Sequence, residues 1–249
     1  MDEAPLSLPE DTVGLLEGIA TTRAIRRFRA EPVPDEALSL MLFAATRAPS
    51  GSNRQPFRFL VLRDGERAAQ AKSLIGTAAR AVWAAKAKAE HYDEGSARVP
   101  DSPKARLAAT MTRFVEEFES VPVLVLPCLV RYRPPTSTEG ASVYPACQNL
   151  LLAARALGYG GVLTGWHQPV EPQLRALLDV PDDVLLAGAI ALGRPEGRHG
   201  PVRRRPVAEL VYDDGWGCSA PWAHDPPGTR FAAAGPPRSR VSGNRSNGA

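Results

Sequence analysis

The chain has 249 residues, of which 44% are hydrophobic and 23% are charged, and its formal net charge is only +3. These values are typical of a soluble globular protein, and so small a charge gives no indication of nucleic-acid binding. No apolar run approaches the length of a membrane span, and the acidic start MDEAPLSLPED lacks the basic and apolar regions of a signal peptide. We therefore expect a cytoplasmic protein that binds neither nucleic acid nor membranes.

The apolar pattern predicts a mixture of helices and strands. The expected helices cover residues 12–21, 34–48, 66–91, 104–119, 144–157 and 171–180, and the expected strands cover 57–63, 121–132, 160–166 and 184–195. The strand over 121–132 is almost entirely apolar and should be buried on both faces. The helix over 144–157 is apolar nearly all round, so it should lie deep in the fold or at a subunit interface. This order predicts an α+β domain built in layers.

Composition divides the chain into three parts. We expect an N-terminal extension over 1–11, a folded domain over 12–217, and a Pro/Gly/Arg-rich tail over 218–249. The tail has no acidic residue after Asp225, and its composition predicts disorder, most clearly over 232–249. The three cysteines are odd in number and widely spaced, which favours free thiols over a disulfide framework. No histidine or cysteine has the spacing of a metal ligand, so no metal site is expected.

Two basic clusters are candidates for binding an anion. The segment TTRAIRRF contains Arg23, Arg26 and Arg27, and a second cluster lies at 203–205. Guanidinium groups form paired hydrogen bonds to phosphate oxygens, but a solvated basic turn explains the same residues. A phosphate group would use both clusters if folding brought them together.

The stretch PSGSNRQP, residues 49–56, places hydroxyl and amide side chains between an expected helix and an expected strand. An amide both donates and accepts hydrogen bonds, which suits the edge of a heterocycle. A simple turn that requires Gly51 is the alternative, and the residues alone do not decide between them.

The segment GYGGVLTGW, residues 158–166, is rich in glycine and follows a helix. Its spacing and position exclude the phosphate turn of a dinucleotide-binding fold. Glycines here would let backbone N–H groups approach a flat ligand. A helix end followed by a strand explains Gly158 but not the run through Gly165. We interpret His167, which follows at once, as a structural residue.

Together these segments resemble the nitroreductase family of FMN-dependent homodimers. The resemblance covers about residues 12–216, and four segments stand in the family's order. They are TRAIRRFRAEPVPDEAL, AATRAPSGSNRQPFRFLVL, ACQNLLLAARALGYGGVLTGW, and ALGRPEGR followed by RRRPVAELVYDDGW. The resemblance implies a three-layer α+β fold with a central, mostly antiparallel sheet flanked by helices, assembled as an interwoven homodimer with two flavin sites at the interface.

The resemblance also implies roles for particular residues. The FMN phosphate would be held by the arginine segment and the late basic cluster, the flavin ring would lie against the amide loop, and backbone N–H groups of the glycine segment would reach its N5 and O4 edge. The implied cofactor-binding residues are Arg23, Ala24, Arg26, Pro49, Ser50, Gly51, Asn53, Gln55, Leu163, Thr164, Gly165 and Arg204. Thr22, Ala24 and Phe57 depart from the family's usual Arg, Ser and Trp. No side chain is expected to act as a catalytic acid or base.

The implied activity is ping-pong transfer of hydride from NADH or NADPH, through FMN, to a small electron-poor aromatic acceptor such as a nitroaromatic or a quinone. Three alternatives remain open. One is a flavin-binding storage or sensor protein. Another is a specialised enzyme that consumes its own reduced FMN or removes halogen from a phenol. The last uses a deazaflavin as electron donor. Four basic residues of the region 66–120 could bind such an acidic donor, although a solvated helix face is the simpler explanation for them: Lys86, Lys88, Arg98 and Lys104.

Overall fold

The computed structural model describes residues 8–232 of the chain. Contacts divide the chain into two compact units, of which the first ends at Gly200 and the second begins at Pro201. The sequence placed the end of the flavin-binding domain at residue 217, and that functional boundary stays a prediction. The predicted disorder of the last residues concerns 233–249, which lie outside the described residues.

Within residues 8–200 the fold contains six α-helices and five β-strands. The helices are α1 (Leu15–Thr21), α2 (Asp35–Thr46), α3 (Glu66–Ala89), α4 (Pro103–Glu116), α5 (Tyr144–Ala156) and α6 (Glu171–Leu178). The strands are β1 (Phe57–Leu62), β2 (Val123–Val130), β3 (Gly160–Thr164), β4 (Val184–Leu186) and β5 (Ala189–Gly193). The elements expected from the sequence are present, with ends that differ by a few residues.

The strands form one sheet in the order β1-β2-β5-β3, in which every pairing is antiparallel. As predicted, β2 lies at the centre and is buried along its length apart from Val130. The prediction of one strand over 184–195 was wrong, because the chain forms two strands there that both pair with β2. The break falls at Gly188, where a side chain would collide with Leu163. Within the described residues β3 pairs only with β5, so it is an edge strand.

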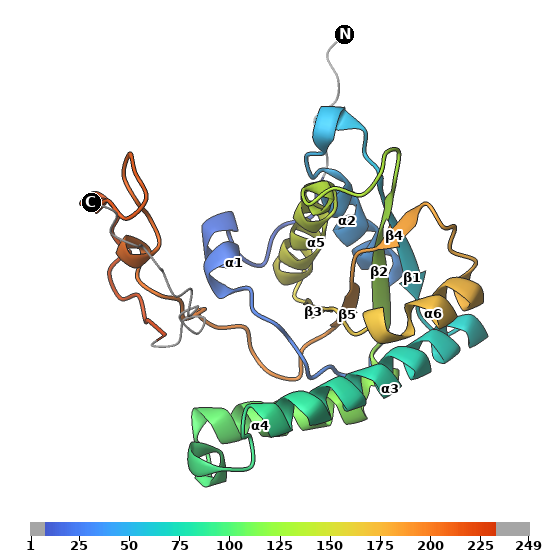
Figure 1. Cartoon of the computed structure of the whole chain (residues 1–249), viewed down its shortest axis with the longest axis horizontal. Helices are drawn as coiled ribbons and strands as arrows, with labels where there is room; N and C mark the ends of the chain where they lie inside the picture. The colour runs from blue at the N-terminus through green and yellow to red at the C-terminus, as the bar shows by residue number, and fades with distance from the viewer. Residues whose placement is uncertain (1–7, 233–249) are drawn as a thin grey trace, which may run out of the picture. The chain divides into compact units, whose positions relative to one another are not determined.

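Helices cover both faces of this sheet, which makes three layers (Figure 1). On one face α2 and α5 pack on alternate residues of the central strands, among them Val123, Val125 and Ile190. On the other face α3, α4 and α6 pack on the residues between these, such as Leu124 and Leu126. The alternation follows from the period of two in a β-strand. The predicted three-layer α+β fold with an antiparallel sheet is confirmed.

Local sequence explains where several helices begin and end. Pro34 and two acidic residues precede and open α2, as the helix dipole favours. The hydroxyl of Ser102 accepts a hydrogen bond from the N–H of Ala105 at 3.0 Å and caps α4. Asp179, in the left-handed conformation, ends α6.

The second unit consists of turns and isolated bridges over residues 201–232. Arg204 bridges Phe231, and the indole of Trp222 donates to the carboxylate of Asp213 at 3.0 Å. Residues 218–232, which the sequence assigned to the tail, therefore belong to this unit. Across the described part of the chain, no helix is both long enough and apolar enough to cross a membrane.

Candidate functional site

The arginine segment runs beside the first residues of β3. The N–H of Ile25 donates to the carbonyl of Gly161 at 3.0 Å, so the chain continues the outer edge of the sheet there. Arg26 is half-buried, and burial together with the positive charge of Arg23 lowers its pKa. Among residues 8–232, no carboxylate lies within ion-pair distance of Arg23 or Arg26. Like charges held together without an acid favour the binding of an anion.

The amide loop has a strained backbone. Ser52, Asn53 and Gln55 have φ of 51°, 50° and 49°, in the left-handed region that residues other than glycine seldom adopt. Each such residue costs on the order of 1 kcal/mol or more, and such strain concentrates at functional sites. The loop is held by its own hydrogen bonds, since Ser50 Oγ accepts from the N–H of Gln55 at 2.9 Å. Two successive residues with positive φ, such as Ser52 and Asn53, also occur in a type I′ turn, so a ligand-facing loop stays a prediction.

The glycine segment presents backbone groups at the open edge of β3. In an antiparallel strand, successive residues direct their N–H and C=O groups to opposite sides. Since the carbonyl of Gly161 accepts from Ile25, the N–H of Leu163 also points away from β5. Thr164 points toward β5 by the same alternation. Leu163 and the residue after the strand, Gly165, are therefore better placed than Thr164 to donate to a ligand.

Steric constraints differ among the glycines of this segment. A Cβ on Gly160 would lie 2.6 Å from the side chain of Ile25, and one on Gly161 would lie 2.6 Å from the carbonyl of Ala191. Packing alone therefore requires both. A Cβ on Gly165 would meet nothing nearer than 3.8 Å, and its φ is not positive. No contact within the described chain explains Gly165, and its predicted role beside a flat ligand stays a prediction.

The arginine segment and the amide loop lie at opposite ends of α5. The N–H of Gly51 donates to Ser142 Oγ at 3.4 Å, just before the helix begins, whereas Ile25 is bonded just beyond its end. A helix of 13 residues is about 20 Å long. The glycine segment spans the distance between them, because Tyr144 donates its OH to Ala187 at 3.3 Å, beside the far end of β3. This arrangement suits an elongated ligand with an anionic end and a flat end.

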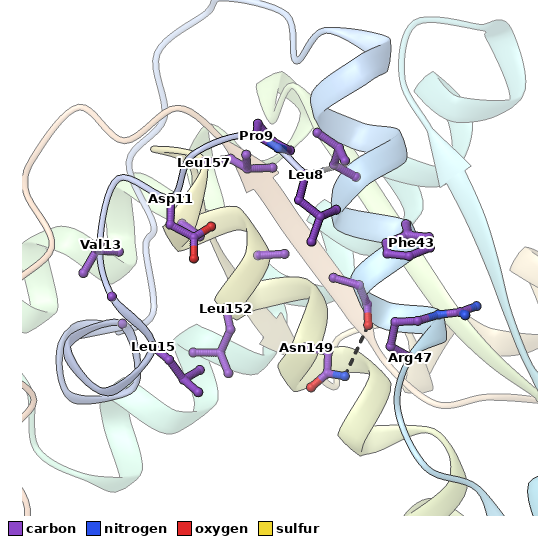
Figure 2. A pocket seen from close by; sticks show the side chains of 16 residues that line it. Leu8, Pro9, Asp11, Val13, Leu15, Phe43, Arg47, Asn149, Leu152 and Leu157 are labelled. Atoms are coloured by element: carbon purple, nitrogen blue, oxygen red, sulfur yellow. Dashed lines mark hydrogen bonds between the residues drawn. The ribbon is translucent and has the colours of Figure 1, made fainter. Parts of the chain in front are cut away.

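A groove of about 420 Å³ lies beside this region, between the N-terminal segment with α1 and the helices α2 and α5. Figure 2 shows Leu15 and Val13 on one side of the groove, Leu152 on α5 with Leu157 just after its end, and Phe43 on α2. Asn149 donates to the carbonyl of Ala44 at 3.2 Å and so joins α5 to α2 across its floor. The groove is mainly apolar, and α1 presents further exposed leucines beside it.

His167 is buried, with 2% of its surface exposed. Its Nε2 donates to the carbonyl of Leu186 at 2.9 Å, and burial lowers its pKa, so the ring is neutral at pH 7. The contact fastens the turn after β3 to β4. This geometry supports the interpretation of His167 as a structural residue.

We expect His167→Gln to retain its full flavin content, because the glutamine amide can also donate to Leu186. The variant should also lose less stability in acid. A histidine with a lowered pKa is neutral in both states above pH 6.5, but below it only the unfolded chain takes up a proton, so acid favours unfolding. Flavin absorbance and unfolding free energies between pH 7 and 5 would check both results. A colourless product would assign His167 to the flavin site.

The basic residues of the helical region 66–120 bind their own hairpin. Lys104 donates to the carbonyl of Glu90 at 2.9 Å, and Arg98 donates to that of Asp93 at 2.6 Å. This favours a solvated helix end over a surface for an acidic electron donor. The thiols of Cys128 and Cys147 are free, as the sequence predicts, and their burial raises their pKa to about 11 and about 12, so both are protonated at pH 7.

Comparison with known proteins agrees with this geometry. The model of the Nitroreductase family matches residues 19–194. The chain belongs to the nitroreductase family. It is 30% identical over 217 residues to 5,6-dimethylbenzimidazole synthase of Rhodospirillum rubrum, an alignment that covers 84% of this chain and 92% of that protein. It is 29% identical over 204 residues to NADH dehydrogenase of Thermus thermophilus, with 76% and 90% covered.

A solved relative links this nitroreductase fold to a cofactor. A Desulfovibrio desulfuricans protein, named as a nitroreductase and solved in complex with FMN, is 30% identical and superposes with a TM-score of 0.59, over 80% of this chain and 96% of that one. The family and fold predicted from the sequence are therefore confirmed. The roles of the individual flavin-binding residues stay predictions, including Arg204, which lies in the second unit.

Sequence reasoning missed two residues of this nitroreductase that the fold places beside the arginine segment. Arg155, in the last turn of α5, donates its Nε to Thr21 Oγ1 at 3.2 Å. His199 donates from its Nε2 to the carbonyl of Tyr159 at 2.9 Å. In the sequence Arg155 is an ordinary basic residue near a helix end, and His199 belongs to no motif that indicates ligand binding. Only the tertiary fold brings them together.

Proposed function

We propose that this protein is an FMN-dependent oxidoreductase that uses NADH or NADPH to reduce flat, electron-poor acceptors such as nitroaromatics and quinones. The observation that supports it most directly is the open backbone edge at Leu163 and Gly165, on the strand whose first residues bond the segment with Arg23 and Arg26. Arg26 is half-buried and Arg23 is exposed, and neither has an acidic partner among the described residues. The FMN complex of the Desulfovibrio relative and the name of the Thermus relative support the cofactor and the donor.

The residues present fit FMN at both of its ends. Arg23 and Arg26 would hold the phosphate, and the strained amide loop would hold its hydroxyl and amide groups against the ring edge. The N–H of Leu163, fixed by the β3–β5 ladder, points away from β5 and would be free to donate to the ring edge and stabilise negative charge on it. When bound, FMN supplies the hydride chemistry, taking hydride from the nicotinamide and giving it to an acceptor that binds in the same place afterwards. No side chain of this chain is required as acid or base.

An absorbance spectrum of the purified protein tests the proposal. We expect a flavin spectrum that bleaches within seconds when NADH or NADPH is added without oxygen, and that returns when a nitroaromatic or a quinone is added. A flavin spectrum that neither nicotinamide bleaches would contradict the donor and favour storage or a deazaflavin donor. A protein that binds no FMN would contradict the whole proposal.

A second candidate is 5,6-dimethylbenzimidazole synthesis, the activity in the name of the Rhodospirillum relative, which covers 84% of the chain. It corresponds to the specialised flavin enzyme expected as an alternative from the sequence. Mass spectrometry after aerobic incubation with FMN and NADPH decides the matter. Formation of 5,6-dimethylbenzimidazole in amounts that grow with time would favour this candidate over the general reductase.

We propose that the protein acts as a homodimer and that the partner covers α1 and the adjoining groove. Leu15, Leu16 and Ile19 of α1 have exposed fractions of 70%, 81% and 52%, more apolar surface than a seven-residue helix of a monomer usually exposes. The groove beside them is mainly apolar as well. A second copy of the chain is the partner that the family resemblance implies.

We expect Leu16→Glu to shift the protein from dimer to monomer, because a carboxylate at this position would have to be desolvated on association. Light scattering after size-exclusion chromatography measures the mass, and Leu107→Glu on α4, exposed by 40%, is the matched control. Flavin content should fall with the dimer fraction. Identical dimers in the wild type and in both variants would exclude α1 from the interface.

A further inference from the structure

The end of α1, the end of α5 and the start of β3 meet at one point of the fold. Arg155 donates its Nε to Thr21 Oγ1 at 3.2 Å, which joins the last turn of α5 to the last residue of α1. His199 bonds the carbonyl of Tyr159 at 2.9 Å, immediately before β3. Ile25, between Arg23 and Arg26, bonds the second residue of β3. Arg155 is therefore held next to the segment that contains two of the predicted phosphate ligands, Arg23 and Arg26.

The charges that shift the pKa values of His199 and Arg26 at this point are positive. Burial lowers the pKa of His199, and the positive charges of Arg155 and Arg23 act in the same direction. Burial and Arg23 lower the pKa of Arg26. Nine other arginines of the described chain have an acidic partner within 4 Å: Arg29, Arg63, Arg67, Arg80, Arg113, Arg131, Arg175, Arg194 and Arg205. Arg155, Arg23 and Arg26 are among the arginines of residues 8–232 that have no such partner, and what sets them apart is their position around Ile25 and His199.

We propose that Arg155 is a further cationic ligand of the cofactor phosphate, beside Arg23 and Arg26. This inference rests on the proposed FMN cofactor and adds a residue from α5 that the family resemblance did not supply. The bond from Nε to Thr21 fixes the plane of the guanidinium and leaves its two terminal nitrogens to donate. A phosphate dianion would neutralise the repulsion among the three arginines, whereas a neutral ligand would not. Arg155 therefore contributes to the affinity for FMN and not to that for riboflavin, which has the same ring without the phosphate.

The test compares the two flavins on the full chain. The dissociation constants of FMN and riboflavin are measured by quenching of flavin fluorescence for the wild type, Arg155→Gln, Arg155→Lys and the control Arg67→Gln. Arg67 lies on α3 and pairs with Asp179 at 2.6 Å. We expect Arg155→Gln to weaken FMN binding about tenfold or more, with riboflavin changed less than about twofold. Arg155→Lys, which retains the charge and guards against misfolding of the first variant, should lie between, and Arg67→Gln should match the wild type.

Each other result overturns a defined part of the inference. If Arg155→Gln binds FMN as the wild type does, Arg155 is not a phosphate ligand. If it weakens FMN and riboflavin equally, Arg155 acts on the fold of the site and not on the phosphate. A wild-type chain that binds FMN no more tightly than riboflavin would overturn the arginine site as a whole, and with it this assignment. Normal discrimination by the wild type without bleaching by nicotinamides would leave Arg155 assigned and refute only the proposed donor.

Discussion

Arg26→Ala should weaken FMN binding about tenfold or more, since a hydrogen bond to a charged group contributes roughly 1.5–3 kcal/mol. The flavin-free protein should nevertheless be as stable as the wild type or slightly more stable. Arg26 is half-buried beside Arg23 without an acidic partner in the described chain, so its removal relieves repulsion and desolvation in the absence of phosphate. Opposite effects on binding and on stability are characteristic of a residue kept for function. Flavin titration and denaturant unfolding measure the two quantities.

Arg29→Ala is the matched control for Arg26. It lies three residues further along the same segment, is about half exposed and forms an ion pair of 3.6 Å with Glu31. An exposed pair of this kind contributes about 0–1 kcal/mol, so the control should change neither quantity much. Arg204→Ala should reduce FMN binding as Arg26→Ala does. Purification of the Arg26 and Arg204 variants with full flavin would refute the assignment of both to the phosphate.

The layers of the fold could be predicted because they depend on local pattern. The apolar run over 121–132 predicted a strand buried on both faces, and the segment over 144–157, apolar nearly all round, predicted a helix deep in the fold or at an interface. The single strand expected over 184–195 shows the limit of this reasoning. A continuous apolar run does not reveal that Gly188 is needed beside Leu163, because that contact comes from the neighbouring strand β3.

Buried polar residues could not be predicted, because their partners are distant in sequence. Lys72 lies in the Ala-, Lys- and Arg-rich region 66–91, which reads as a solvated helix. It is nevertheless 95% buried, since only 5% of its surface is exposed, and its Nζ donates to the carbonyls of Arg63 and Val121 at 2.8 and 2.7 Å. Arg155 was equally unremarkable in sequence. Motif spacing identified Arg23 and Asn53 as candidate site residues. The charges that surround them are known only from the tertiary structure.

Gly161→Ala and Gly165→Ala should have opposite consequences, although they are four residues apart on one segment. A Cβ on Gly161 would lie 2.6 Å from the backbone carbonyl of Ala191, which cannot move without disturbing the β3–β5 ladder. Overpacking of this kind costs about 1–3 kcal/mol. A Cβ on Gly165 would find only ordinary contacts at 3.8 Å, so Gly165→Ala should be neutral or stabilising by up to about 1 kcal/mol, because alanine restricts the unfolded chain.

The effects on FMN binding should be the reverse of the effects on stability, because only Gly165→Ala should weaken binding. Gly165→Ala places a methyl group where the ring edge would approach the backbone, so we expect weaker FMN binding and a shifted flavin spectrum in a fully folded protein. Gly161→Ala should bind FMN normally below its lowered melting temperature. Gly197→Ala, where an added Cβ meets nothing nearer than 3.6 Å, is the control for both. If Gly165→Ala binds FMN with wild-type affinity and spectrum, the flavin does not approach this backbone. Neither packing nor cofactor binding would then explain why residue 165 is a glycine.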